Sequence, residues 1–112
     1  MNSRSSAYLI LTMVSATLVT LPPEVSADER LARRIGCTDC HAVVQKGVGP
    51  AYSDIAARYR GNADAGEALV RIVKNGGKGN WTAATGGVAM PPYSALLADA
   101  EVRLLVEWVL SQ

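Results

Sequence analysis

Apolar positions recur at helical spacing in several stretches of the chain, and glycine or proline separates these stretches. In the first stretch Leu31 and Ile35 share one face, and in the last one Val102, Leu105 and Val109 do the same. No segment shows the strict alternation of a strand. Helices are therefore predicted over four ranges: 28–36, 53–60, 64–74 and 99–110. The glycine-rich residues between 75 and 87 are predicted to be irregular.

The amino terminus has the pattern of an export signal. Arg4 is followed by an apolar run over residues 7–21, and Val25-Ser26-Ala27 offers small residues before Asp28. We predict a signal peptide over residues 1–27, cleaved after Ala27. An uncleaved membrane anchor is the alternative, but the run is shorter than the roughly 20 residues that a spanning helix needs.

Composition limits what the remaining chain can do. The 112 residues carry a net charge of +1 and contain no Phe. Removal of the signal leaves residues 28–112, enough for one domain with a modest core, and chains this short commonly need a staple or a cofactor. The near-neutral charge gives no indication of nucleic-acid binding.

Cys37-Thr38-Asp39-Cys40-His41 forms the C-x-x-C-H pattern of covalent haem attachment. Two thiols at this spacing can bond the two vinyl groups of a porphyrin, and the next residue, His41, can reach the iron. A structural disulfide and a thiol oxidoreductase are the rival interpretations, and neither needs the histidine. A structural zinc site would need four protein ligands, which the chain lacks once the signal is removed.

Counting the possible iron ligands in the same way leaves only one residue for the second axial position. His41 is the only histidine, and Met1 and Met13 leave with the signal, so Met90 is the remaining candidate. Two prolines follow it and stiffen its loop. With both axial positions filled by protein, substrate has little access to the metal. The sequence therefore predicts an electron carrier and not an enzyme.

Together these motifs resemble the class I cytochromes c of the short bacterial, periplasmic, monohaem type. The resemblance implies an all-α fold of four to five short helices around one covalently attached haem c. It covers nearly all of residues 28–112. It rests on these motifs: Gly36 before the C-x-x-C-H, Gly49-Pro50-Ala51-Tyr52, Lys74-Asn75-Gly76, Gly79-Asn80-Trp81, Met90-Pro91-Pro92 and Trp108-Val109-Leu110-Ser111.

The resemblance also implies roles for individual residues. The carbonyl of Pro50 should accept a hydrogen bond from the ring of His41, and the indole of Trp81 should donate to a haem propionate. The cofactor-binding residues expected from motif and resemblance are Cys37, Cys40, His41, Pro50, Trp81 and Met90. Three residues are expected to meet where the first and last helices cross: Gly36, Leu31 and Trp108.

The chain departs from the resembled pattern at several positions. Ala32 stands where relatives usually have Phe, and Tyr93 stands where they often have Asn. Ile72 fills a place that can hold a propionate-binding arginine, although Arg71 is adjacent. The segment before Met90 has an insertion around residues 82–87. We expect these departures to affect stability and potential more than the type of cofactor.

The predicted function is one-electron transfer in the periplasm between respiratory redox proteins such as a terminal oxidase, a nitrite reductase or a dehydrogenase. A monomer without stable membrane insertion is expected. The alternatives are a haem subunit of a multisubunit dehydrogenase and a small-ligand sensor from which Met90 dissociates. Four basic residues near the attachment motif could steer an acidic partner, unless they are ordinary solvated charges: Arg30, Arg33, Arg34 and Lys46.

Overall fold

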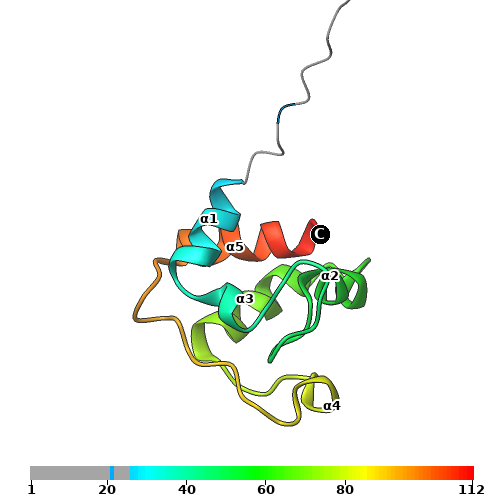
Figure 1. The fold of residues 1–112 in the computed structure, drawn as a ribbon. Coiled ribbons are helices and arrows are strands. Elements are labelled where there is room, and N and C mark those ends of the chain that lie inside the picture. The colour runs from blue at the N-terminus through cyan, green and yellow to red at the C-terminus, as the bar shows by residue number, and fades with distance from the viewer. Residues whose placement is uncertain (1–20, 22–25) are drawn as a thin grey trace, which may run out of the picture.

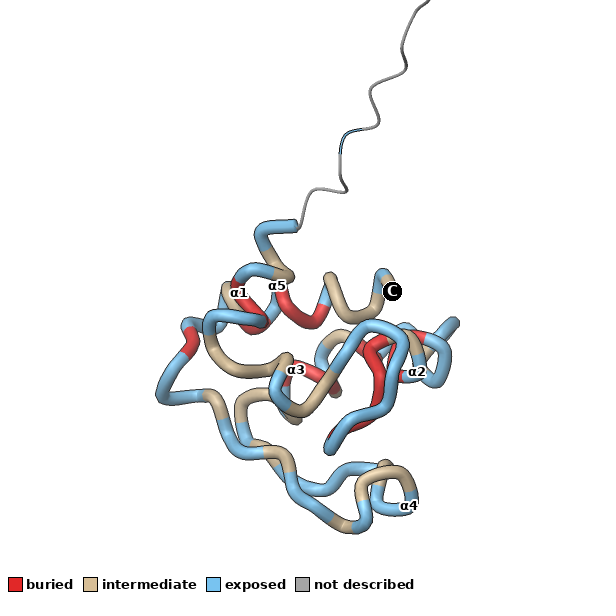
Figure 2. Tube along the Cα trace, viewed as in Figure 1, coloured by how far each residue is buried: buried red, intermediate tan, exposed pale blue. Residues whose placement is uncertain are grey.

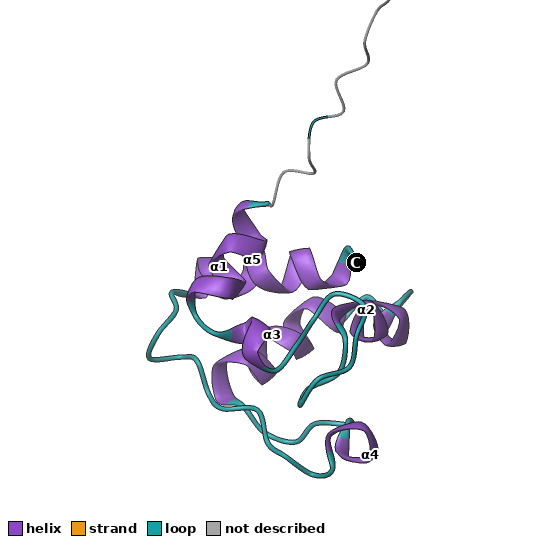
Figure 3. Cartoon of the chain, in the orientation of Figure 1, coloured by secondary structure: helices purple, strands orange, loops and turns teal. Residues whose placement is uncertain are grey.

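The computed structural model describes Leu21 and residues 26–112, in which all regular structure is helical (Figures 1 and 3). The predicted all-α fold is confirmed for this part of the chain. In order, the elements are α1 (Ala27–Arg34), the 3-10 turn η1 (Cys37–Asp39), α2 (Tyr52–Tyr59), α3 (Ala65–Asn75), α4 (Thr82–Thr85) and α5 (Asp99–Leu110).

The carboxy-terminal helix α5 organises the core. Its buried residues Val102, Leu105 and Val106 follow the predicted helical spacing, and α5 packs against α1, α2 and α3. Figure 2 shows buried residues in all four of these helices. Since the core contains no Phe, the cluster consists mainly of aliphatic side chains around the ring of Tyr52.

Helix α1 begins and ends where its sequence favours a boundary. The Ser26 hydroxyl accepts a hydrogen bond from the Glu29 amide at 3.0 Å, and Gly36 takes a left-handed conformation with φ of 85° directly after the helix. Ala32 is only 1% exposed, so this position is enclosed although relatives were expected to have Phe here. Leu31 and Trp108 belong to the same hydrophobic cluster, as the expected crossing of α1 and α5 requires.

One element was missed by the sequence analysis. Residues 75–87 were predicted to be irregular throughout, but α4 forms a single helical turn inside the expected insertion. The Trp81 carbonyl accepts hydrogen bonds from the amides of Ala84 and Thr85, and Gly86 ends the turn with φ of 63°. The prediction was wrong because glycine density hid the short stretch of helix-compatible residues between the glycines.

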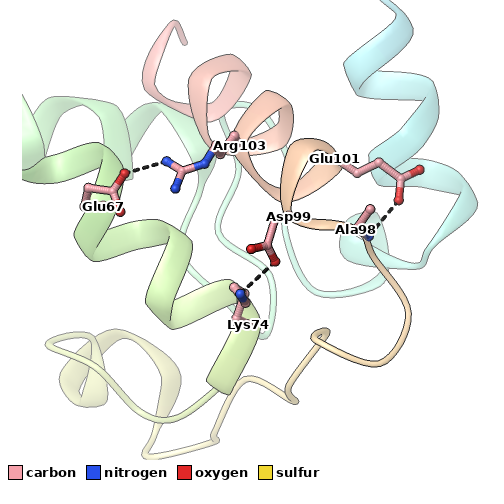
Figure 4. A network of polar contacts seen from close by, with 6 residues as sticks. All are labelled: Glu67, Lys74, Ala98, Asp99, Glu101 and Arg103. Carbon is pink, nitrogen blue, oxygen red and sulfur yellow. Dashed lines mark hydrogen bonds and ion pairs between the residues drawn. The ribbon is translucent and has the colours of Figure 1, made fainter.

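Exposed ion pairs join α3 to α5 (Figure 4). Lys74 donates to the Asp99 carboxylate at 2.7 Å, and Arg103 pairs with Glu67 one helical turn farther along. Glu101 reaches back to accept the Ala98 amide at 3.0 Å, at the beginning of α5. These contacts hold the two helices in register, and each contributes little because it is solvent-exposed.

The Asp99 contact should nevertheless give a pH signature. The hydrogen bond and charge of Lys74 lower the pKa of Asp99 from its ordinary 3.8. A lowered pKa adds stability above the ordinary value, and this contribution is lost as the pH falls further. We therefore expect Asp99→Asn to be less stable than the wild type near neutral pH and the difference to shrink progressively as the pH falls below 3.8 toward the lowered pKa of Asp99. Urea unfolding at several pH values measures this, and in a Lys74→Met background the difference should be smaller, with only the weaker effect of Arg103 remaining.

The predicted signal peptide falls mainly on residues 1–20 and 22–25, which lie outside the described residues. Its extent and cleavage after Ala27 stay predictions, and cleavage at that point would remove the Ser26 cap and the first residue of α1. Within the described part of the chain, none of the helices has the length and apolar character that crossing a membrane requires.

Candidate haem site

The attachment motif forms a compact turn directly after α1. Because Gly36 adopts a positive φ, the chain reverses there, and the His41 amide then donates to the Cys37 carbonyl at 3.0 Å. Both Cys37 and Cys40 are free thiols, so the turn contains no disulfide. Burial raises the pKa of the Cys37 thiol, which disfavours the thiolate that an oxidoreductase would need.

The His41 ring is held by a carbonyl. Its Nδ1 lies 2.7 Å from the carbonyl oxygen of Pro50, the contact that the resemblance implied. Because a proline carbonyl can only accept, Nδ1 must donate its proton, and Nε2 is left with a free lone pair. This is the tautomer in which imidazole ligates a metal through Nε2.

Gly49 lies against the face of the same ring. A Cβ placed on this glycine would overlap with the His41 ring, with Nδ1 and Nε2 both only 2.8 Å away. The Gly49 amide also donates to the Cys40 carbonyl at 2.8 Å. Gly49 therefore packs against the imidazole, and Pro50 next to it accepts the hydrogen bond from that imidazole. An ordinary surface turn would require neither contact.

Met90 is fixed by backbone contacts with the end of α3 and the turn after it. Gly77 and Met90 exchange two backbone hydrogen bonds of 2.9 Å, and the Tyr93 amide donates to the Val73 carbonyl at 3.0 Å. Gly76 contacts the Met90 carbonyl so closely that no side chain would fit between them. Backbone contacts with α3 and the turn after it therefore locate the methionine, in addition to the stiffness of the two prolines.

Trp81 lies at the start of α4 and is partly buried. The Arg58 guanidinium of α2 stacks over its ring, 4.7 Å from the centroid, in a cation–π contact. Ile72 contributes an apolar side chain to the pocket that Trp81 also lines, whereas Arg71 is exposed. The charge nearest to Trp81 in these contacts thus comes from α2, an element in which the sequence analysis predicted no site residue.

One apolar pocket brings the predicted residues together. Its lining includes aliphatic and aromatic side chains from α2, α3 and α5. Gly36 and Trp108 both line it, whereas Leu31 lies in the core beside it. All six predicted cofactor-binding residues line this pocket: Cys37, Cys40, His41, Pro50, Trp81 and Met90.

This donor set fits a haem. Two thiols, an imidazole nitrogen and a thioether surround an apolar space, and a close-packed glycine leaves room for the imidazole. Among the described residues no group of three or more His, Cys, Asp or Glu side chains could hold a bare metal ion. The pocket therefore suits an iron that arrives inside an apolar macrocycle.

Tyr52 is a site residue to which the sequence analysis assigned no role. Its ring stacks on His41 with centroids 5.4 Å apart and an interplanar angle of 19°. Its position in the sequence was the available signal. The Pro50 carbonyl contacts His41, and Tyr52 follows Pro50 by two residues as the first residue of α2, so its ring is expected near the histidine.

Two of the four basic residues near the attachment motif have carboxylate partners. Arg33 pairs with Glu29 one turn before it, and Arg34 lies 3.6 Å from Glu101 of α5. These pairs partly offset the positive charge of Arg33 and Arg34, which weakens the hypothesis that the four residues steer an acidic partner.

Comparison with known proteins identifies the family of this chain. The family model for cytochrome c matches residues 29–112. Cytochrome c-551 of Allochromatium vinosum is 48% identical over 84% of this chain and 95% of the relative. Cytochrome c-552 of Hydrogenobacter thermophilus is 39% identical over 93% of this chain and 95% of the relative. The crystal structure of Nitrosomonas europaea cytochrome c552 matches with a TM-score of 0.65 at 39% identity, over 73% of this chain and 95% of that one.

The geometry and these similarities lead to one assignment. The matched region contains the attachment motif, the histidine-binding carbonyl and the methionine loop. The chain therefore belongs to the cytochrome c family, as a class I monohaem electron carrier with one covalently attached haem c.

Proposed function

We propose that the protein shuttles single electrons in the periplasm, with haem bonded to Cys37 and Cys40 and with its iron ligated by His41 and Met90. The observation that carries the proposal is the tautomer of His41, whose Nδ1 proton is committed to the Pro50 carbonyl at 2.7 Å. Nε2 is therefore the free ligand atom in a pocket that Met90 also lines.

The chain's own residues support transfer of electrons without chemistry on a substrate. When bound, the haem supplies an iron that accepts and releases one electron. The Met90 thioether is neutral and soft, so it favours the reduced metal and raises the potential. The apolar lining excludes water, and the backbone contacts of both ligand segments hold the two side chains in place in either oxidation state.

The same backbone contacts favour the carrier over the small-ligand sensor. A sensor needs Met90 to leave the iron readily, but two hydrogen bonds to Gly77 fix the methionine backbone. The haem subunit of a dehydrogenase remains the second interpretation from the sequence, and it would use the same site. Purification of the native protein, alone or with a dehydrogenase, distinguishes the two.

Location and partners complete the proposal. The predicted export signal over residues 1–27 supports a periplasmic location after cleavage, where the protein is expected to be a monomer. Its partners would be redox proteins such as a terminal oxidase, a nitrite reductase or a dehydrogenase. Genomic neighbours of the coding sequence are the direct guide to which of these it serves.

Replacing Met90 tests the ligation. We expect Met90→Ala to lose the weak far-red absorption band of Met-ligated ferric haem and to bind carbon monoxide in the reduced state, because the axial position opens. The optical spectrum of the purified holoprotein measures both.

Thr82→Ala is the matched control, since Thr82 is exposed in the same loop and does not line the pocket. It should keep the far-red band and exclude carbon monoxide. A Met90→Ala protein with the wild-type spectrum would mean that another group ligates the iron.

A further inference from the structure

The haem-binding histidine has a second neighbour besides the Pro50 carbonyl. Tyr52 is 4% exposed and stacks nearly parallel to the His41 imidazole, at a centroid distance typical of aromatic pairs. Gly49 lies against the same imidazole. The ring of His41 is therefore limited by a hydrogen bond at Nδ1 and by packing against both a glycine and an aromatic ring.

The position of Tyr52 relative to His41 is set by the backbone. The Tyr52 amide donates to the carbonyl of Ala42, the residue next to His41, at 2.9 Å. The following amide, that of Ser53, donates to Val43 at the same distance. The first turn of α2 is thus tied to the chain that leaves the histidine, which keeps the backbones of the two residues next to each other.

Tyr52 is also held from behind. Trp108 of α5 makes an edge-to-face contact with it, with centroids 5.0 Å apart and an angle of 65° between the planes. The three rings form a series from the pocket to the carboxy-terminal helix: His41, Tyr52 and Trp108. Because Tyr52 is packed between its two neighbours, rotation of its ring would disturb both contacts.

The hydroxyl group contributes nothing visible to this arrangement. The Tyr52 hydroxyl is buried and has no hydrogen-bond partner among the residues that the structure describes. A buried, unpaired hydroxyl costs stability, so the reason for an aromatic residue here is the ring and not its polar tip. The Nδ1–Pro50 hydrogen bond fixes the imidazole at one atom only, whereas a stacked ring restrains rotation about that bond.

We propose that Tyr52 is a positioning residue that sets the plane of the His41 imidazole through ring stacking, backed by Trp108. This rests on the proposed ligation of iron by His41. The plane of an axial imidazole governs how its π orbitals overlap with those of the metal, so the stack tunes the electronic state of the carrier. Tyr52 acts through the histidine and takes no part in electron uptake itself.

The test uses the ferric holoprotein and two substitutions at one position. Tyr52→Leu removes the ring, and we expect exchange of the His41 Nδ1 proton with solvent to quicken about two- to tenfold, as the usual worth of an aromatic pair implies. The paramagnetic shifts of the haem methyl groups, which report the imidazole plane, should change with it. Tyr52→Phe keeps the ring and should leave both readouts as in the wild type.

Two controls separate positioning from loss of packing. Tyr59 lies in the same helix as Tyr52 and packs against the core but does not line the pocket, so Tyr59→Leu should leave the Nδ1 exchange rate unchanged. Exchange of the Val106 amide, in the buried middle of α5, reports global opening and serves as the reference. If Tyr52→Leu binds too little haem, Trp108→Leu should quicken the Nδ1 exchange to a smaller extent.

The outcomes are separable. Unchanged exchange and methyl shifts in Tyr52→Leu would overturn the positioning role while leaving His41 as the ligand. Equal changes in Tyr52→Phe and Tyr52→Leu would also overturn it, because the hydroxyl would then be responsible. A wild-type protein without histidine-ligated iron would instead remove the proposed function itself.

Discussion

Gly76→Ala is expected to lose most of its Met ligation and to unfold at a markedly lower denaturant concentration. Gly76 has φ of 68° and ψ of −162°, a region essentially restricted to glycine. An added Cβ would also overlap with the Met90 carbonyl and lie 2.9 Å from Pro92 N. Backbone strain and overpacking together should cost about 3 kcal/mol or more. Guanidinium unfolding and the far-red band of the ferric holoprotein measure the two effects.

Gly61→Ala separates strain from crowding. Gly61 also has a positive φ, 78°, but a Cβ there would meet nothing within 4 Å. It should lose only about 1 kcal/mol and keep the far-red band. If the two variants behaved alike, the close approach of Gly76 to the methionine loop would have no energetic role.

Gly49→Ala is expected to act on the other axial ligand. Its Cβ would overlap with the His41 ring, so the imidazole must turn away from the Pro50 carbonyl or the backbone must move. We expect a loss of about 1–3 kcal/mol in unfolding free energy and a lower yield of holoprotein. Denaturant unfolding and the haem content of the purified protein measure these effects.

Gly66→Ala is the matched control for this substitution. Gly66 lies in α3, where a Cβ has open space around it. Alanine is favoured over glycine in a helix, so this variant should gain about 0.5–1 kcal/mol. An equal gain in Gly49→Ala would contradict the close contact with the imidazole.

Much of the fold could be predicted because each long helix has its own apolar face and a recognisable end. Helix α5 was predicted with its observed limits, Asp99–Leu110, and the other three long helices were predicted within one or two residues at each end. Helix α4 was missed because a turn of four residues has no apolar period of its own. The end of α4 depends on the positive φ of Gly86, and its start depends on the hydrogen bonds that the Trp81 carbonyl accepts. Neither feature can be recognised from the sequence.

The site divides in a similar way. Cys37, Cys40 and His41 lie within five consecutive residues, so their spacing alone indicates haem attachment. Tyr52 could not be given a role because its function depends on a ring contact between α2 and the attachment motif. The Arg58 contact with Trp81 was missed for the same reason, since the two residues come from elements far apart in the chain.

The paired hydrogen bonds between Gly77 and Met90 also bear on how this family can vary. They close residues 78–89 into a loop whose two ends are joined at its base. Because the cost of closing a loop rises only slowly with length, residues can be added or removed at its tip with little penalty. We expect Met90 to keep its place under such insertions and deletions, so the rim of the pocket could be remodelled without displacing the proposed ligand.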